Sequence, residues 1–451
     1  MPEEATIAGQ ATQQDVAEDR AEDVAQDVVE GEGEGEGVAR REGAAMRLRA
    51  ASAPVRRSVA DELYGPLPVA RWAQALLEAP PFARLAGVSL SDVPGALLFR
   101  RPFPSRLAHS LGVYYLARQA RPRDRALHAA ALAHDLGHGP FSHLTEPLMI
   151  ERLGIDHERR SVDLLRQALQ RAPGETARLL AWLDPDEVAA LMLGGGPEGR
   201  GALLNGALDY DNIDNVARFL QASGLGELSY DPRALARELR LSEAPTSGAP
   251  EVALAADGAG LAQAWLDDRR RVYGYLCAGE RNLALHGMLR KAVDLAAEAG
   301  MITPAFFDAT DADALRLLRE GVSLGAATLT EAVARDQLYA RVWEVSAPAQ
   351  DDALATLFAQ GQARLALEER VAHEAGLAPH EVVLSYTIAR GERALPPILA
   401  PMPGRAAPVA SVPLATASPT TPARAISLLI AHSAGRDYVR RACMAVERAL
   451  G

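Results

Sequence analysis

The histidines of this chain are unevenly distributed, and most of them belong to one short stretch. Six of the ten lie between residues 109 and 157. Within it, His134 and Asp135 stand side by side at the end of the apolar segment 127–136. Burying two such polar groups costs free energy unless they find partners. A divalent cation is a suitable partner, because imidazole nitrogen and carboxylate oxygen together suit Fe, Mn or Zn.

A metal site needs more ligands than this pair. His109 lies near the start of the preceding predicted helix, and in an antiparallel helix pair the start of one helix lies beside the end of the next. His109 can therefore meet His134 and Asp135. The acidic run 209–214 is the source of a fourth ligand. Aspartate also suits helix N-caps, so we expect one of these acids to serve only as a cap.

The elements that position these residues are mainly helical. Apolar spacing predicts helices over 70–77, 108–119, 127–136, 158–170, 207–221 and 261–299, and another that begins at Asp184. Two β-like stretches, 238–242 and 251–255, are joined by the turn-rich segment 243–250, and a further strand is predicted over 382–388. Residues 194–197 and 401–423 are expected to be loops. The fold class is therefore mainly α, with a small β-hairpin and a mixed α/β C-terminal region.

Charge and composition exclude several classes of partner. The net charge is −12, but residues 1–45 hold thirteen acidic residues against three arginines, which leaves the body close to neutral. This body gives no electrostatic sign of nucleic-acid binding. An acidic tail also disfavours docking on an anionic membrane. Residues 1–56 have too little apolar surface to offset their ordering entropy, so we expect a disordered tail.

Nothing in the sequence suggests secretion or membrane insertion. It has no apolar run of the ~18–20 residues needed to cross a bilayer, and no signal-like start. Cys277 and Cys443 are too few for a disulfide framework. We expect a cytoplasmic protein with two reduced thiols.

Four segments resemble the HD-domain phosphohydrolases, and in particular their deoxynucleoside triphosphate triphosphohydrolase branch. They are 106–117, 134–143, 157–161 and 205–218, within a resemblance that covers about 60–295. The resemblance implies an HD-domain helical bundle over 57–300, between the acidic tail and a C-terminal region over 301–451. Because related enzymes form oligomers, it also suggests a homo-oligomer.

The resemblance assigns roles residue by residue. It makes four residues the metal ligands: His109, His134, Asp135 and Asp211, the last because it takes the ligand place in the acidic run. It places His138, His143, His157 and Arg106 near the phosphates of a small-molecule substrate, and Glu146 where the family often has an acid. The ion can be Fe, Mn, Zn, Co or Mg.

The chemistry fits these residue types. The metal would polarise a phosphoryl oxygen and activate a water molecule. His143, oriented by Glu146, would be the general acid. His138, His157 and Arg106 would stabilise charge on the phosphoryl oxygens. Alternatively His138, four residues after His134, lies on the same helical face and shares a zinc ion with it.

The sequence departs from the family where the nucleotide is recognised. Residues 214–219 lack the family's aromatic residue and last carboxylate, and Phe219 cannot accept a hydrogen bond. Leu90 stands at the place of a sugar-contacting glutamine, and Asn212 replaces a basic residue. We therefore expect a nucleotide or nucleotide-like phosphoester other than the usual deoxynucleoside triphosphates.

Two other functions are open. One is a phosphodiesterase acting on a cyclic or oligomeric nucleotide. The other is a regulatory protein with a vestigial HD site that binds partners through its tail and C-terminal region. Complete ligand and auxiliary histidine sets favour an enzyme. Beyond residue 301 no chemistry is legible, and His373, His380 and His432 are interpreted as structural.

Overall fold

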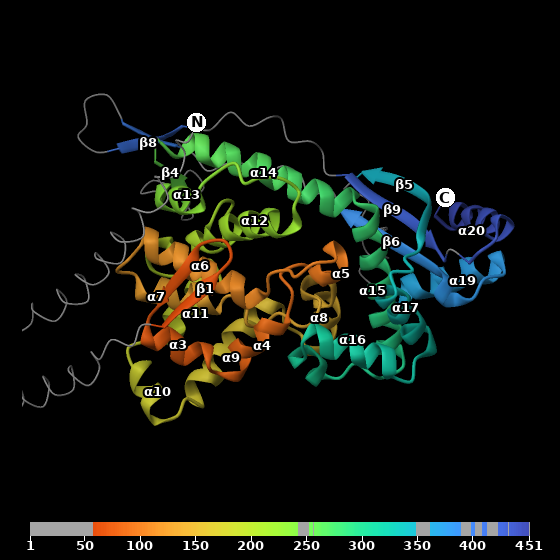
Figure 1. The fold of residues 1–451 in the computed structure, drawn as a ribbon, viewed down its shortest axis with the longest axis horizontal. Helices are drawn as coiled ribbons and strands as arrows, with labels where there is room; N and C mark the ends of the chain where they lie inside the picture. Colours follow the sequence, from red (N-terminus) through yellow and green to blue (C-terminus); the bar gives the residue numbers. More distant parts are fainter. Residues whose placement is uncertain are drawn as a thin grey trace, which may run out of the picture. The chain divides into compact units, whose positions relative to one another are not determined.

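The structure is a computed structural model that describes residues 57–241, 252–255, 257–348, 361–388, 398–401, 408–412, 423–431 and 433–450. The predicted mainly helical fold with small sheets is confirmed (Figure 1). The predictions for the tail 1–56, for the turn 243–250 and for His432 lie outside the described residues. The predicted domain boundaries stay predictions.

The N-terminal half is a β-hairpin followed by packed helices. The hairpin pairs β1 (Arg57–Asp61) with β2 (Gly65–Val69). The helices are α3 (Arg71–Leu77), α4 (Pro80–Arg84), α5 (Gly95–Phe99), α6 (Arg106–Ala120), α7 (Arg125–Ala133), α8 (Glu146–Leu153), α9 (His157–Gln170), α10 (Gly174–Leu179), α11 (Pro185–Met192), α12 (Tyr210–Ser223) and α13 (Pro232–Glu238). Short 3-10 helices η1 (Leu85–Gly87), η2 (Ser142–Leu144) and η3 (Pro197–Leu203) lie between them. The loop predicted over 194–197 overlaps η3 at its last residue, Pro197.

Side-chain caps fix where the central helices begin. Ser105 accepts a hydrogen bond from the backbone N–H of Ala108 at the start of α6, and Asp124 does the same for Leu127 at the start of α7. Asp209 caps α12 by accepting from Asn212. Such caps stabilise a helix by about 1 kcal/mol each. The prediction that one acid of the 209–214 run is a cap fits this role of Asp209.

Helix α7 lies at the centre of the largest core cluster, between α6 and α11. Its residues from Leu127 to Ala133 are all buried, as an apolar helix surface predicts. Burial of one side chain such as Leu132 stabilises the fold by about 2 kcal/mol. The core thus holds α6 and α7 side by side (Figure 1), which brings the start of α6 near the end of α7.

Helix α7 ends three residues earlier than predicted, and the reason is a contact with α9. Gly137 is packed so tightly that a β-carbon there would lie 1.9 Å from the carbonyl oxygen of His157. Ser161 accepts the Gly137 N–H at 2.7 Å and donates to the carbonyl of His134 at 2.7 Å. The chain from residue 134 to 137 therefore turns instead of continuing the helix. The helical register that would place His138 above His134 is wrong.

The predicted long helix over 261–299 is also wrong, because it consists of two helices. Helix α14 (Gly258–Ala278) ends and α15 (Glu280–Glu298) begins at Gly279, which has an extended backbone (φ −68°, ψ 116°). Asn282 secures the corner by donating from its side chain to the Leu276 carbonyl at 2.7 Å. The break directs α15 onto the C-terminal sheet, where Gly287 allows close contact with Val383.

The C-terminal part combines two small sheets with helices. The helices are η4 (Pro304–Asp308), α16 (Asp311–Glu320), α17 (Leu324–Ala334), α19 (Gly361–Ala375), η5 (Pro379–Glu381) and α20 (Arg436–Leu450). An antiparallel sheet has the order β5 (Ala340–Pro348), β9 (Ala423–Ile430), β6 (Val382–Ile388). A second sheet has the order β3 (Leu239–Leu241), β4 (Val252–Leu254), β7 (Ile398–Pro401), β8 (Pro408–Val412), with β4 and β7 parallel.

Strands β3, β4 and β6 lie where the sequence predicts them. Strand β8 falls inside the stretch 401–423, so the prediction of a loop there is wrong for these residues. No helix of the described chain combines the length and the apolar content that a bilayer crossing requires.

Candidate active site

The structure brings the four predicted metal ligands together from three helices. His109 belongs to the first turns of α6, His134 and Asp135 follow α7, and Asp211 lies in the first turn of α12. His109 Nε2 is 2.9 Å from Asp211 Oδ1 and 3.8 Å from Asp135 Oδ2. His134 Nε2 is 3.4 Å from Asp135 Oδ1 and 3.9 Å from Asp211 Oδ1. The ligand atoms of His109, His134 and Asp135 lie within 4.8 Å of one another, and Asp211 Oδ1 lies beside both imidazoles. Metal binding by the four residues stays a prediction.

The donor atoms fit a cation. His134 Nδ1 donates to the Ala131 carbonyl at 2.8 Å, so its Nε2 carries the lone pair. That Nε2 is buried and has no hydrogen-bond partner among the described residues. Burial alone would lower the pKa of His109, but hydrogen bonds to Asp211 and Asp214 raise it to about 9, so a cation at Nε2 would replace the proton that Asp211 holds there. Two imidazoles and two carboxylates at one point are a donor set that divalent metals prefer.

A buried ionic network holds His109 from behind. Asp214 is fully buried and accepts from His109 Nδ1 at 2.7 Å and from Arg218 Nε at 2.9 Å. Arg218 also donates to Asp61 at 2.8 Å. Burial would raise the pKa of Asp214, but Arg218 and His109 lower it to about 2. A carboxylate behind an imidazole is the usual partner of a metal-binding histidine. Sequence reasoning missed this role, although the 211–214 spacing places both acids on one helix face.

Gly112 on α6 packs directly against the Asp214–Arg218 ion pair. A β-carbon at Gly112 would lie 1.9 Å from Asp214 Oδ1 and 2.4 Å from Arg218 Nη2. We expect Gly112→Ala to lower the free energy of unfolding by about 2 kcal/mol or more, because the buried ion pair must shift. Urea unfolding measures this. The matched control is Gly274→Ala on α14, where a β-carbon would have no neighbour within 4 Å. This substitution should raise the free energy of unfolding by up to about 1 kcal/mol, because alanine favours the helix more than glycine does. Equal stability of both variants would contradict the packing argument.

Arg106 is tied to one of the candidate ligands. It donates from Nη1 to Asp135 Oδ2 at 2.9 Å and from Nε to Ser142 Oγ at 2.9 Å. Burial would raise the pKa of Asp135, but Arg106, His134 and His138 hold it well below its usual range. Asp135 is therefore a negatively charged candidate ligand whose orientation is fixed by Arg106. Both residues line a cavity that is described below.

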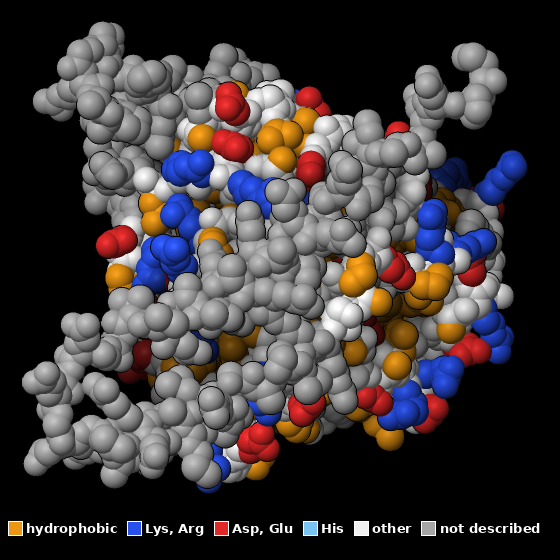
Figure 2. Space-filling model, turned by 60° about the vertical axis from the view of Figure 1, so that its left-hand side comes forward, with side chains coloured by type: hydrophobic (Ala, Val, Ile, Leu, Met, Phe, Trp, Pro, Cys, Tyr) orange, Lys and Arg blue, Asp and Glu red, His pale blue; other side chains and the backbone are white. Residues whose placement is uncertain are grey.

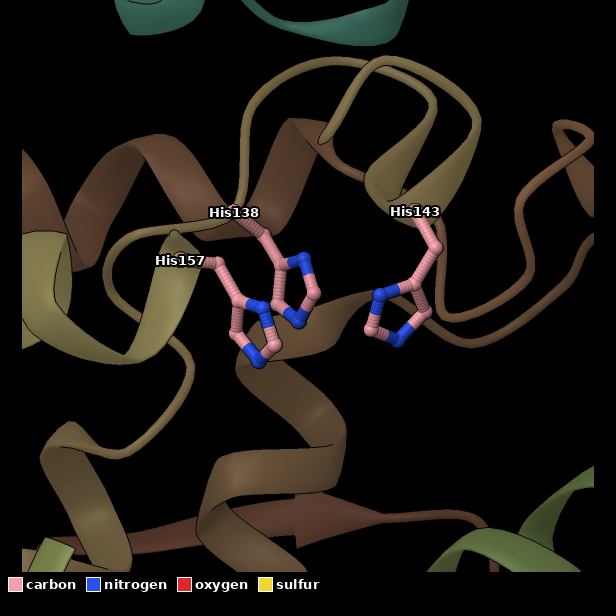
Figure 3. A group of neighbouring side chains, drawn as sticks. All are labelled: His138, His143 and His157. Carbon is pink, nitrogen blue, oxygen red and sulfur yellow. The ribbon is translucent and has the colours of Figure 1, made fainter. Parts of the chain in front are cut away.

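Three further histidines form a cluster beside this group (Figure 3). The rings of His138 and His157 stack at 3.9 Å between centroids, and the ring of His143 lies edge-on, 4.7 Å from His138. Glu146 accepts from His143 Nδ1 at 2.8 Å and from His157 Nδ1. One carboxylate thus orients two imidazoles. The predicted pairing of His143 with Glu146 is present, and the pairing of His157 with Glu146 was not foreseen.

Proton positions within the cluster follow from these contacts. Burial and the nearby Arg106 and His157 keep the pKa of His138 well below its usual range, so His138 is neutral. Burial would lower the pKa of His157, but Glu146 raises it. Desolvation would raise the pKa of Glu146, but its two histidines hold it far below its usual range. The cluster can therefore present N–H donors to an anion. One ring nitrogen from each of the three histidines also lies within 4.8 Å of the other two, which is close enough to hold a cation.

Both groups open into a cavity of about 420 Å³. The three positions that depart from the family, Leu90, Asn212 and Phe219, all line it. Helices α14 and α15 and strand β6 close the other side, with residues that sequence reasoning did not assign to the site: Val272, Leu276, Cys277, Asn282, Leu283, Ser385 and Tyr386. Only the fold brings β6 to the helices that carry the two groups, so no local signal could have found its contribution.

Comparisons with known proteins match the part of the chain that contains this site. The family profile described as "HD domain" matches residues 106–222. The deoxynucleoside triphosphate triphosphohydrolase SAMHD1 of Gallus gallus is 32% identical over 129 residues, 24% of this chain and 20% of that protein. A deoxyguanosinetriphosphate triphosphohydrolase-like protein of Geobacter metallireducens is 34% identical over 88 residues, 18% of this chain and 23% of that protein. The uncharacterized protein YwfO of Bacillus subtilis is 29% identical over 170 residues, 33% of this chain and 36% of that protein.

These matches cover about a fifth to a third of the relatives' lengths. They confirm the resemblance that the sequence predicts. The matched range 106–222 contains every residue predicted for the site, from Arg106 to Asp211. Residues 106–222 therefore carry an HD domain.

Proposed function

We propose that this chain is a metal-dependent phosphohydrolase that acts on a nucleotide or nucleotide-like phosphoester. The observation that carries the proposal is that two different groups face one cavity. The first consists of His109, His134 and Asp135, whose ligand atoms lie close enough together to hold a cation, with Asp211 beside both imidazoles. The second, held by Glu146, is a set of imidazole N–H donors. A cation beside such donors can stabilise the charge that develops when a phosphoester is hydrolysed.

The cation would be held by His109, His134, Asp135 and Asp211. When bound, it supplies a Lewis acid for a phosphoryl oxygen and lowers the pKa of a water molecule. Fe, Mn, Zn, Co and Mg are all compatible with nitrogen and oxygen donors.

The protein's own residues do the remaining work. Glu146 takes hydrogen bonds from Nδ1 of His143 and His157, which leaves each Nε2 available to the substrate. His143, exposed at the cavity, gives the Nε2 proton to the departing oxygen. His157, with its raised pKa, donates to a phosphoryl oxygen. Arg106 keeps Asp135 charged and oriented.

The test is release of phosphate, pyrophosphate or triphosphate from a panel of nucleotides and generic phosphoesters with Mg, Mn, Co or Fe. We expect wild-type turnover, and a loss of about 1,000-fold or more in Asp211→Ala. This variant should fold, because Asp211 is one-third exposed and Asp209 still caps α12. No turnover by metal-loaded wild type would contradict the proposal and favour a non-catalytic role.

Metal content separates the two groups. We expect a single equivalent of metal per chain, lost in Asp211→Ala and retained in His143→Ala, because we assign His143 to the phosphate-facing cluster held by Glu146 and not to the group of His109, His134, Asp135 and Asp211. Elemental analysis after dialysis measures this. Loss of metal in His143→Ala, or a second equivalent in wild type, would make the three histidines metal ligands instead of phosphate donors.

A further inference from the structure

We propose that the cavity takes a phosphomonoester, with a single terminal phosphate on an uncharged body, and disfavours a polyphosphate chain. The inference deepens the proposed function and rests on it. It concerns the charges that line the cavity and the shape of its far wall.

The first argument is the balance of charge around the cavity. Among the described residues that line it, Arg106 is the one lysine or arginine. Five carboxylates line the same cavity: Asp135 and Asp211 are proposed cation ligands and Asp209 caps α12, which leaves Asp92 and Glu158 as the acids that bear on the substrate. The chain as a whole is rich in arginine, with 46 against a single lysine. Figure 2 shows many of these arginines on the surface. Basic residues are therefore abundant in the protein and scarce at the cavity.

The second argument is that Arg106 is already neutralised. Its guanidinium is paired with Asp135 at 2.9 Å, with both side chains buried. The charge of a substrate must then be balanced by the cation and by the histidine cluster alone. A phosphomonoester carries about −1.5 to −2 at neutral pH. Each further phosphoryl group would bring a charge with no partner in the described cavity, and burying an unpaired charge is costly.

The third argument is where two of the acids lie. Asp92 accepts a hydrogen bond from the backbone N–H of His143 at 3.2 Å. Glu158 directly follows His157 and accepts from Asn205 at 3.3 Å. Asp92 therefore contacts the cluster that would hold the phosphate, and Glu158 lines the same cavity. A chain of phosphates extending from this cluster meets like charge, which opposes its binding.

The far wall fits an uncharged body. It combines apolar and aromatic side chains with neutral polar ones: Phe219, Val272, Leu276, Leu283, Asn215, Asn282, Ser385 and Tyr386. A volume of about 420 Å³ is in the range of small-molecule sites, and apolar walls with a few polar groups are their usual lining. A nucleoside-sized ring system can occupy this part while its single phosphate reaches the histidines.

The experiment uses a matched series on the metal-loaded full chain. Nucleoside mono-, di- and triphosphates with one base are compared by kcat/KM and product, beside an aryl phosphomonoester and the corresponding diester. We expect kcat/KM for the monophosphate to exceed that for the triphosphate about tenfold or more, with inorganic phosphate as product. Preference for the triphosphate or the diester would overturn this inference and leave the phosphohydrolase proposal standing. Silence on every substrate would overturn both.

A variant tests the cause. Glu158→Gln removes one negative charge beside the histidine cluster, and Glu320→Gln is a matched exposed control outside the cavity. We expect KM for the triphosphate to fall about tenfold in Glu158→Gln and KM for the monophosphate to change less than about threefold. Neither value should change in the control. A triphosphate KM that does not respond to Glu158→Gln would contradict the charge argument.

Discussion

Replacing Asp214 with alanine should lower the free energy of unfolding by about 3 kcal/mol or more and weaken metal binding 10- to 100-fold. The substitution removes two of the three carboxylate hydrogen bonds of the buried Arg218 guanidinium, leaving only Asp61. It also removes the acceptor of His109 Nδ1, so the imidazole loses the contact that orients it. Urea unfolding and metal titration measure the two effects separately.

The control for this variant is Asp231→Ala. Asp231 is exposed and caps α13 by accepting the backbone N–H of Arg233, so its loss should cost about 1 kcal/mol and leave metal affinity unchanged. A destabilised Asp214→Ala protein with unchanged metal affinity would reduce Asp214 to a structural residue. Unchanged stability would contradict the argument for the buried ion pair.

The depressed pKa of Asp214 leads to a prediction of how the free energy of unfolding depends on pH. Burial would raise the pKa of Asp214, but Arg218 and His109 hold it at about 2, below the ordinary value near 4. A depressed pKa contributes stability that is present above the unfolded value and is lost as the pH falls. The difference between wild type and Asp214→Ala should therefore be full above about pH 5 and shrink toward pH 2.

The elements that the sequence predicts well are those set by local pattern. Strand β6 occupies its predicted residues 382–388 because β-branched and aromatic side chains favour an extended chain there. Helix α7 is buried from Leu127 to Ala133, as the apolar surface of that stretch requires. Convergence of His109 with His134 and Asp135 followed from antiparallel helices alone. In these cases the determining contacts are close in sequence or repeat along one helix.

What the sequence could not predict depends on distant contacts. The early end of α7 is set by Ser161, whose hydroxyl bonds both Gly137 and His134. The break at Gly279 is not visible in the apolar spacing, since a single glycine is tolerated within a helical pattern. Which acid meets which nitrogen of His109 depends on how the ring is rotated, and Arg218 and Asp61 fix that by tertiary contact. The contribution of β6 to the cavity also depends on tertiary contact and could not be predicted from local sequence.

Replacing Glu146 with glutamine should have the largest effect on turnover without loss of metal. Glu146 holds His143 and His157 through their Nδ1 atoms, and neither residue belongs to the group of His109, His134, Asp135 and Asp211 that we propose as the cation site. We expect kcat to fall about 100- to 1,000-fold, because the proton donor loses its orientation. The matched control is Glu187→Gln, which removes an ion pair with Arg200 away from the cavity and should leave kcat unchanged.

The pH profile of the Glu146→Gln protein distinguishes a catalytic arrangement from a structural one. Burial alone lowers the pKa of His157, and Glu146 is what raises it. Without that carboxylate the pKa falls, so the protonated imidazole that donates to the phosphate is lost at a lower pH. The alkaline limb of kcat should therefore move toward acid. A reduced kcat with an unmoved alkaline limb would mean that Glu146 supports the loop around η2 and does not control the proton on His157.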